Sequence, residues 1–529
     1  MIKKKRKFRF ARMHPITSVI LLTILVMIFS SILSLFEVQT TYSTIGANNN
    51  LESELVAVEG LFNFDGFKYL ISNAAVNFAS FTPLSTLLLA LIGLSVCHAS
   101  GFIDAFIKRR TLSINNKTIT FVIIFLAVIS SIINEVGYVV LIPLSALIFL
   151  ANGRNPLLGI TASFCGVAFG YGATLFAGST EVSLVPITES ASLLVDSAFH
   201  TQMLSNLFAI IVSSIVLSIV GTIIIENVIS KRIGRYKNDD DIDSLTKEMN
   251  PLEVALEEQK RIDAEIKEKK GLKNAGIAFA IVILFFVYCL IPGLPFSGLL
   301  LDMKESAYIS RLFGPNSYFQ DGFTFMVSML FLVVGISYAV GAKTISSDKD
   351  LVEKASFYLK DVGYIIALIF FFSQFIAVYK KTNIGTFILA LISNIIRGLT
   401  ITGIPLVVVV LILIAISSIF VTTTSLKWRV LAPVVVPIMM QANISPQFSQ
   451  FVFRAGDSMT KGFTPLLAYF VIYLGYLNMY NKEKEPITIR KALSFVSPYC
   501  LIISITWILL VVFIYLMGLP IGPGVYPNI

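Results

Sequence analysis

The sequence predicts an all-α polytopic membrane protein with about nine transmembrane helices and two re-entrant helical hairpins in an inverted-topology repeat. The first observation is composition: of 529 residues, 56% are hydrophobic and 14% are charged, and the mean hydropathy is +0.81. The second is a series of apolar runs near the ~20 residues that a spanning helix needs. The third is the net charge of +9, which comes from lysines and arginines that lie mostly in short segments beside apolar runs. This distribution is typical of the positive-inside bias and argues against nucleic-acid binding.

Residues 1–110 are predicted to hold a basic N-terminus, two helices and an outer loop. The head MIKKKRKFRFAR precedes an apolar run from Ile16 to Phe36 with no small-residue cleavage site behind it, which indicates a retained helix and a cytoplasmic N-terminus. The following loop is acidic, as expected of an outer loop, with Glu37, Glu52, Glu54, Glu59 and Asp65. A second span near Ile71 to His98 returns the chain to the basic segment at 108–110.

Residues 111–230 contain the first hairpin candidate, at 119–151. It is apolar on both sides of a polar centre made of Ser130, Ser131, Asn134, Glu135 and Gly137. Both flanks are basic, and each arm of about 15 residues is short for a full crossing, so we expect a re-entrant hairpin entering from the cytoplasmic side. Two short spans with a polar outer turn are the alternative. A broken span from Pro156 to about Gly178 and a return span at 204–229 follow.

The second half follows a charged segment at 231–272, which is poor in aromatic residues and is interpreted as a solvated helical cytoplasmic linker. Three further regions are expected: scaffold and pre-hairpin helices at 273–403, a second hairpin with a broken helix at 404–480, and a last helix with the C-terminus at 481–529. Within them, the spans and hairpin arms are placed at 274–292, 322–341, 360–402, 404–443, 446–475 and 495–517.

A weak internal repeat joins the halves. Tyr138, Pro143, Pro156 and Gly166 lie 290 positions before Trp428, Pro433, Pro446 and Gly456. TLLLALI from Thr86 and TFILALI from Thr386 form a further pair at an offset of 300, each immediately before a hairpin. With opposite expected orientations, these pairs suggest an inverted-topology repeat, whose site lies near the bilayer midplane.

The stretch 421–470 is apolar enough to lie in lipid but carries five charges, at Lys427, Arg429, Arg454, Asp457 and Lys461. A charge at membrane depth costs a few kcal/mol or more, so these charges need a partner or a purpose. Prolines and glycines interrupt the stretch, and broken helices at this depth line cavities. The segment is therefore interpreted as half of a transport site.

Three of these charges share one helix face. Arg454, Asp457 and Lys461 recur at steps of three and four residues, so pairing lowers their burial cost. Asp457, flanked by two cations, should stay ionised and would accept a coupling ion only if the pairing loosens; a static salt-bridge cluster is the alternative. Trp428 could stack on a substrate ring or serve packing alone. Hydroxyls that could hold a carboxylate or a cation are those of Ser425, Ser458 and Thr464.

The runs TSLKWRVLAPVVVP and ISPQFSQFVFRAGDSMTKGFTPL, with NFASFTPLSTLLL, GRNPLLGI and GLPIGPGVYP, resemble the AbgT family of aminobenzoyl-glutamate transporters over nearly the whole chain. The resemblance implies a homodimer in a bacterial cell membrane, each subunit with nine spanning helices and two re-entrant hairpins. It also implies uptake of p-aminobenzoyl-glutamate and export of sulfonamide antimetabolites driven by the proton motive force.

The resemblance further implies a set of site residues. The substrate-binding positions that it implies are Ser425, Trp428, Pro446, Arg454, Asp457 and Pro465, together with the hairpin pair Asn134 and Glu135; Ser458 is added to them for its hydroxyl. Ion coupling, by a proton or by sodium, falls on Asp457 and Glu181, and a sodium ion, if one binds, is expected near Asn134 and Asp457.

The chain departs from the family pattern in its charges. Glu181 and Glu135 stand where the family usually has Asp, Lys380 and Lys381 replace an Asn-Trp pair, and Lys461 replaces a neutral residue. We expect the extra lysines to favour anionic ligands, such as a glutamyl dicarboxylate, over neutral sulfonamides; lysines that snorkel to the interface are the alternative.

Other function classes fit less well. The four cysteines and three histidines are dispersed, so no disulfide, zinc or haem site is expected. No Walker A, HExxH, CxxC or partnered GxSxG motif is visible, so neither an enzyme nor a cofactor is expected. A channel and a sodium-coupled dicarboxylate transporter remain as alternatives. An elevator-like alternating-access mechanism rests on fold analogy.

Overall fold

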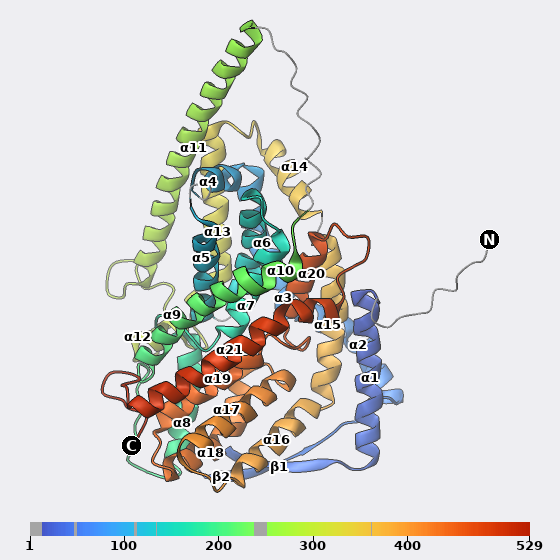
Figure 1. Cartoon of the computed structure of the whole chain (residues 1–529), viewed down its shortest axis with the longest axis vertical. Coiled ribbons are helices and arrows are strands. Elements are labelled where there is room, and N and C mark those ends of the chain that lie inside the picture. The colour runs from blue at the N-terminus through green and yellow to red at the C-terminus, as the bar shows by residue number, and fades with distance from the viewer. Residues whose placement is uncertain (1–12, 47–49, 111–113, 134, 237–250, 361) are drawn as a thin grey trace, which may run out of the picture.

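The computed structural model describes residues 13–46, 50–110, 114–133, 135–236, 251–360 and 362–529. The described chain is helical apart from one two-stranded sheet (Figure 1). Within these residues, nine helical stretches are long and apolar enough to cross a membrane. The prediction of a helical membrane protein with about nine spans is confirmed at this level.

The N-terminal region contains helices on both sides of a β-hairpin. Its elements are α1 (Pro15–Leu35), β1 (Gln39–Ile45), β2 (Leu51–Ala57), α2 (Phe64–Ala79), α3 (Thr82–Ala99) and α4 (Phe102–Arg110). β1 and β2 pair antiparallel, with Gln39 opposite Ala57 and Ile45 opposite Leu51. The sequence did not predict this hairpin within the acidic loop. The second predicted span is also divided, because the backbone breaks between α2 and α3.

The first hairpin candidate folds as two helices joined by a polar turn. Its elements and those that follow are α5 (Asn116–Ile129), η2 (Ser130–Ile133), α6 (Val136–Ala151), α7 (Pro156–Phe169), α8 (Ser179–Ser192), α9 (Leu207–Ile224), the π-helical turn η3 (Ile225–Ile229) and α10 (Ser230–Ile233). The predicted broken span, from Pro156 to about Gly178, is helical over α7 only; α8 begins after residues 170–178, beyond the predicted end of the span.

The central region begins with a helix of 40 residues, α11 (Pro251–Leu290). This helix joins the described part of the charged linker to the following apolar span without a break. The other elements are α12 (Tyr308–Phe313), α13 (Tyr318–Ala342), α14 (Asp348–Leu359), α15 (Val362–Lys381) and α16 (Ile384–Arg397). The predicted segment 360–402 is divided between α15 and α16, where Asn383 has a φ of 58°.

The last region holds the second helix pair, α17 (Gly403–Phe420) and α18 (Thr424–Gln441), joined by only three residues. It continues with α19 (Pro446–Thr460), α20 (Phe470–Met479) and α21 (Ile489–Met517). Adding the 290-residue offset to α6 gives 426–441, and adding it to α7 gives 446–459, which match α18 and α19 to within two residues. The offset seen in the sequence therefore matches a repeated order of elements.

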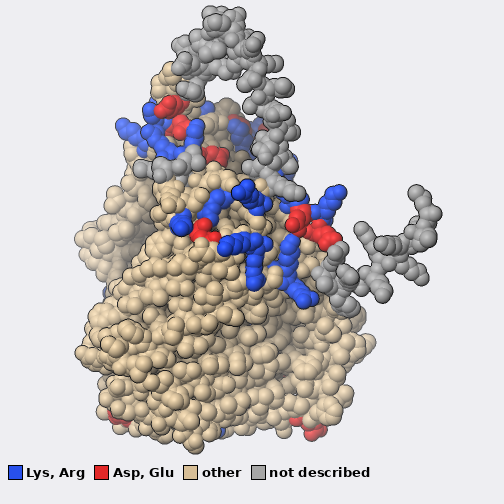
Figure 2. All heavy atoms as spheres, in the orientation of Figure 1, with Lys and Arg blue, Asp and Glu red and all other residues tan. Residues whose placement is uncertain are grey.

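The two helix pairs lie in different parts of the molecule. Figure 1 shows α5 and α6 in its upper half and α17 and α18 in its lower half. Lysine and arginine side chains gather across the upper part of the face in Figure 2.

α7 and α19 begin in the same way and are the most deeply buried helices. Asn155 accepts a hydrogen bond from the Leu157 N–H at 3.0 Å, and Ser445 accepts one from the Phe448 N–H at 3.3 Å. Each cap is followed by a proline at the first helical position, where a missing N–H costs nothing. Nearly every residue of both helices is buried. Both helices end in the interior of the protein. The loops that follow them therefore also lie inside it.

Candidate functional site

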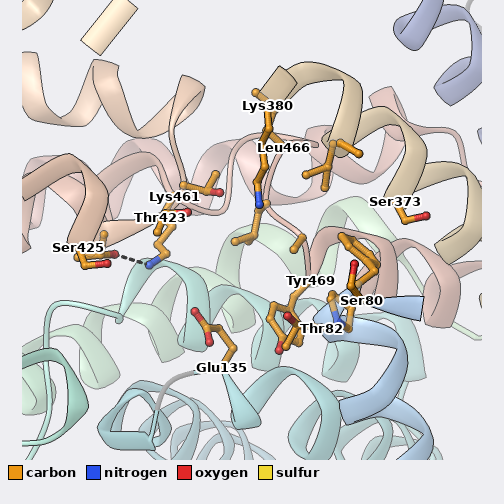
Figure 3. Close-up of a pocket in the computed structure, with 18 of the residues that line it drawn as sticks. Ser80, Thr82, Glu135, Ser373, Lys380, Thr423, Ser425, Lys461, Leu466 and Tyr469 are labelled. Carbon is orange, nitrogen blue, oxygen red and sulfur yellow. Dashed lines mark hydrogen bonds between the residues drawn. The ribbon is translucent and has the colours of Figure 1, made fainter. Parts of the chain in front are cut away.

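A cavity of about 770 Å³ lies where the polar tips of the two helix pairs face the loops after α7 and α19 (Figure 3). Glu135 lines it from the first tip, and residues 422–425 line it from the second. Tyr171 contributes from the loop after α7, and Lys461 and Tyr469 bound the loop after α19. The wall is completed by the start of α8, the α2–α3 junction and the end of α15. Hairpin tips and helix breaks thus enclose one polar chamber.

The chamber holds two ammonium groups from different elements. Lys461 is 2% exposed, and its Nζ donates to Thr424 Oγ1 at 2.8 Å and lies 3.1 Å from the centroid of the Tyr171 ring. Lys380 is exposed and extends from the end of α15 into the chamber (Figure 3). Lys381 instead pairs with Glu59 at 2.8 Å on the cavity wall. Two of the three extra lysines therefore give the chamber its positive charge.

Asp457 lies behind the chamber wall, at the centre of a buried charge cluster. Its Oδ1 accepts from Ser418 at 2.9 Å and contacts the ammonium of Lys427, while its Oδ2 accepts from Thr424 at 2.6 Å. Lys461 Nζ lies 3.7 Å from Oδ2. With one carboxylate and two ammonium groups in their usual ionised forms, the cluster carries a surplus positive charge beside the cavity.

Arg454 does not take part in this cluster as the sequence spacing suggested. It forms an ion pair with Glu181, the acidic residue in the first turn of α8, and both side chains are buried. The other carboxylate oxygen of Glu181 accepts from the Gly178 N–H at 2.8 Å. The expected Arg454–Asp457–Lys461 row is therefore divided, because α8 and α18 supply closer partners than the helix's own face does.

Trp428 lies outside the chamber and is fully buried. Its ring stacks on Phe453 with centroids 4.5 Å apart, and its indole N–H donates to Thr188 at 2.9 Å. The face expected to stack on a substrate is thus covered by protein.

The remaining predicted residues divide into two groups. Ser425 and Glu135 line the chamber, whereas Ser458 donates to the Arg454 carbonyl oxygen at 2.8 Å behind its wall. Pro446 starts α19 and Pro465 lies in the loop after it, and neither lines the chamber. Asn134 lies outside the described residues, so its place near a sodium ion stays a prediction.

A second, smaller cavity of about 330 Å³ adjoins the chamber. The two share Lys380, Thr422, Thr423 and Leu466 among their lining residues. The rest of the smaller cavity is lined mainly by apolar groups, among them Phe420, Val421, Leu426 and Gly385. We call it the side pocket.

Residues 11–529 match the AbgT putative transporter family. The chain belongs to this family. The p-aminobenzoyl-glutamate transport protein of Escherichia coli (strain K12) is 29% identical to it over 516 residues, which cover 98% of this chain and 94% of the relative.

Two solved structures are also similar to this AbgT-family chain. The YdaH transporter of Alcanivorax borkumensis is 24% identical, with 97% of this chain and 100% of that chain covered and a TM-score of 0.47. MtrF of Neisseria gonorrhoeae, one of a class of antimetabolite efflux pumps, is 28% identical, with 97% of each chain covered and a TM-score of 0.47. By its family, this chain is a multi-pass membrane transporter and not an enzyme.

Several residues of this AbgT-family site were missed by sequence reasoning. Lys427 was recognised as a charge at membrane depth but was not assigned to the site. Its place within an apolar run is the same sequence feature that assigned Asp457 to the site. Tyr171 had a weaker signal, since it lies 290 positions before Lys461 and so occupies the equivalent position of the repeat. The threonines at 422–424 carried no signal beyond their place at a hairpin tip.

Proposed function

We propose that this chain is a secondary active transporter of anionic, aromatic N-acylated glutamates, of which p-aminobenzoyl-glutamate is the representative. The observation that carries the proposal is a polar chamber of about 770 Å³ with the ammonium groups of Lys380 and Lys461 on its wall and the ion pair of Lys427 and Asp457 behind Lys461. A ligand with two carboxylates matches these cations, and charge-assisted hydrogen bonds are stronger than neutral ones. The name of the Escherichia coli relative supports the same substrate.

We assign the aromatic end of the substrate to the side pocket. Phe420, Val421 and Leu426 give it apolar walls, and it opens from the chamber beside Lys380. A substrate that spans both cavities would place its carboxylates near the lysines and its ring in the side pocket. Burial of the ring contributes favourably, at about 25 cal/mol per Å² of apolar surface removed from water.

Export of sulfonamide-like antimetabolites is a second candidate activity. The side pocket would accept their ring, and MtrF is one of a class of antimetabolite efflux pumps. A neutral sulfonamide gains less from the lysines than a dicarboxylate does, so we expect the anionic substrate to bind more tightly.

The proposed mechanism is alternating access driven by the proton motive force. In it, α5–α6 and α17–α18 are re-entrant hairpins of an inverted repeat, and with the broken helices they move as an elevator-like unit against the scaffold. The repeated order of elements and the shared chamber support this arrangement. The N-terminus is proposed to be cytoplasmic, on the side where Lys and Arg gather.

The proposed assembly is a homodimer. The most apolar 18-residue window of α11, within residues 262–290, is only 11% buried within one chain, which leaves this part of the helix free to contact lipid or a second copy.

Flux measurements in proteoliposomes test the proposed function. Radiolabelled p-aminobenzoyl-glutamate and a sulfonamide would be followed under imposed proton and sodium gradients of either sign. We expect saturable accumulation of the anionic substrate that depends on the proton gradient. Accumulation that follows only the sodium gradient would favour the sodium-coupled alternative, and ohmic single-channel currents would favour a pore.

A further inference from the structure

The carboxylate of Asp457 lies in an oxygen-lined position that already contains a cation. Ser418 Oγ and Asp457 Oδ1 contact this cation, and the Ser418 hydroxyl donates to Oδ1; the Thr424 hydroxyl donates to Oδ2 on the other side of the carboxylate. Lys427 Nζ donates to Ser418 Oγ at 2.7 Å and contacts Asp457 Oδ1. The side chains of Ser418, Lys427 and Asp457 are at most 1% exposed.

The chemistry of this lining is that of a site for a small hard cation. Carboxylate and hydroxyl oxygens are the ligands that such cations take in proteins. An ammonium group and a sodium ion carry the same charge, and both use these oxygens. We propose that this is a monovalent-cation site whose occupant is the ammonium of Lys427, so that Asp457 does not recruit sodium.

Lys461 does not fill the same position. Its ammonium lies on the Oδ2 side, bonded to Thr424, whereas Lys427 lies on the Oδ1 side with Ser418. Removal of Lys427 alone therefore leaves an unfilled cation position between Ser418 and Asp457. A sodium ion bound there would restore the net charge of the native cluster.

An ion from solution has a route to this position. Thr424 and Lys461 line the main chamber, and both also contact Asp457. Only this one layer of side chains separates the carboxylate from the chamber. Lys427→Ala shortens the side chain and should open the latent site to sodium from the chamber.

Thermal unfolding in detergent tests this proposal without any substrate. Wild type and Lys427→Ala would be compared in sodium chloride and in choline chloride at equal ionic strength. We expect the Tm of wild type to be the same in both salts, and the Tm of Lys427→Ala to be lower in choline and to rise by a few degrees in sodium. Lys461→Asn is the matched control: it also removes a cation next to Asp457 but keeps Lys427, so no sodium effect is expected.

Three further variants keep the proposal falsifiable. Lys427→Arg, which keeps a cation, should be insensitive to sodium. Lys427→Ala combined with Asp457→Asn should lose the sodium effect, because the carboxylate is gone. Lys427→Gln keeps a longer side chain and would replace the alanine variant if that variant does not fold in either salt. Sodium stabilisation of wild type, or no sodium effect in the folded Lys427→Ala or Lys427→Gln single variant, would overturn the proposal.

A transport assay is the second test of this proposal, and its interpretation rests on the proposed function. Wild-type transport should be unchanged when choline replaces sodium at fixed pH, whereas any transport retained by Lys427→Ala should require sodium. If no substrate is transported at all, the proposed function fails while the unfolding results still decide the cation assignment.

Discussion

Tyr171 and Lys461 occupy equivalent positions of the two repeats and meet at the wall of the chamber. The ammonium of Lys461 lies 3.1 Å from the centroid of the Tyr171 ring. Each residue lies in or next to the break that follows a buried helix, Tyr171 after α7 and Lys461 after α19. A cation over an aromatic face is stabilised more when both are desolvated. The repeat therefore brings an aromatic ring and a cation together at the place where the substrate is proposed to bind.

Lys461→Asn should reduce anion binding with only a small loss of stability. The substitution removes the surplus positive charge and leaves the buried pair of Lys427 and Asp457 intact, but it also removes the contact with the Tyr171 ring and the hydrogen bond to Thr424, so the Tm should fall slightly. The Kd for p-aminobenzoyl-glutamate should increase about tenfold, or ~1.4 kcal/mol. Lys381→Asn combined with Glu59→Gln is the control, because the pair is removed together and the charge of the chamber wall does not change. An equal loss of affinity for a neutral sulfonamide would contradict the electrostatic explanation.

Trp428→Phe should lower stability while leaving substrate affinity unchanged. The variant loses the indole hydrogen bond to Thr188, which costs about 1 kcal/mol, whereas Trp428→Ala leaves a cavity and should cost roughly 3–5 kcal/mol. Thermal unfolding and equilibrium binding of p-aminobenzoyl-glutamate separate the two effects. Weaker binding at an unchanged Tm would instead assign Trp428 to the substrate.

Leu426→Trp should fill the side pocket and discriminate between substrates. The larger side chain occupies space proposed for the aromatic ring, so the Kd for p-aminobenzoyl-glutamate should increase about tenfold, the equivalent of ~1.4 kcal/mol. Competition by N-acetyl-glutamate, which has the carboxylates but no ring, should be unaffected. If both ligands lose affinity equally, the ring does not bind in the side pocket.

Arg454 and Glu181 should show strong energetic coupling. Arg454→Gln leaves the buried carboxylate unpaired, and Glu181→Gln leaves the buried guanidinium unpaired, at about 3–5 kcal/mol each. The double variant buries no unpaired charge and should recover part of that loss. A double-mutant cycle of unfolding free energies measures the coupling. Additive losses would show that the pair does not act as a unit.

Gly172→Ala should destabilise the loop after α7. A Cβ at this position would lie 2.6 Å from both the Arg454 carbonyl oxygen and Ser458 Oγ, so the loop or α19 must move. Such overpacking typically costs about 1–3 kcal/mol. Gly276→Ala in α11 is the control, since a Cβ there meets nothing within 4 Å. Thermal unfolding of the two variants gives the comparison, and a similar small effect for both would argue against a tight contact at Gly172.

The sequence predicted most of the helical plan and part of the site. Hydropathy and helix-breaking residues predicted the positions of both helix pairs. The starts of α7 and α19, at Pro156 and Pro446, were predicted to the residue. The β-hairpin was missed. It is held in place from outside, since Asn394 of α16 donates to the Thr41 carbonyl oxygen at 3.0 Å. Such support comes from distant residues and leaves no local pattern.

Within the site, the sequence by itself determined that most charges of the apolar run 421–470 are buried, because a charge in such a run has few other places to go; Arg429 is the exception and is exposed. It also determined which positions share a helix face, because helical periodicity is local. The tertiary structure decided the partners. Arg454 pairs with Glu181, 273 positions away, and Asp457 pairs with Lys427 from the neighbouring helix. The physical reason is that the energy of a buried ion pair depends on which elements pack around it, and the spacing along one helix does not specify its neighbours.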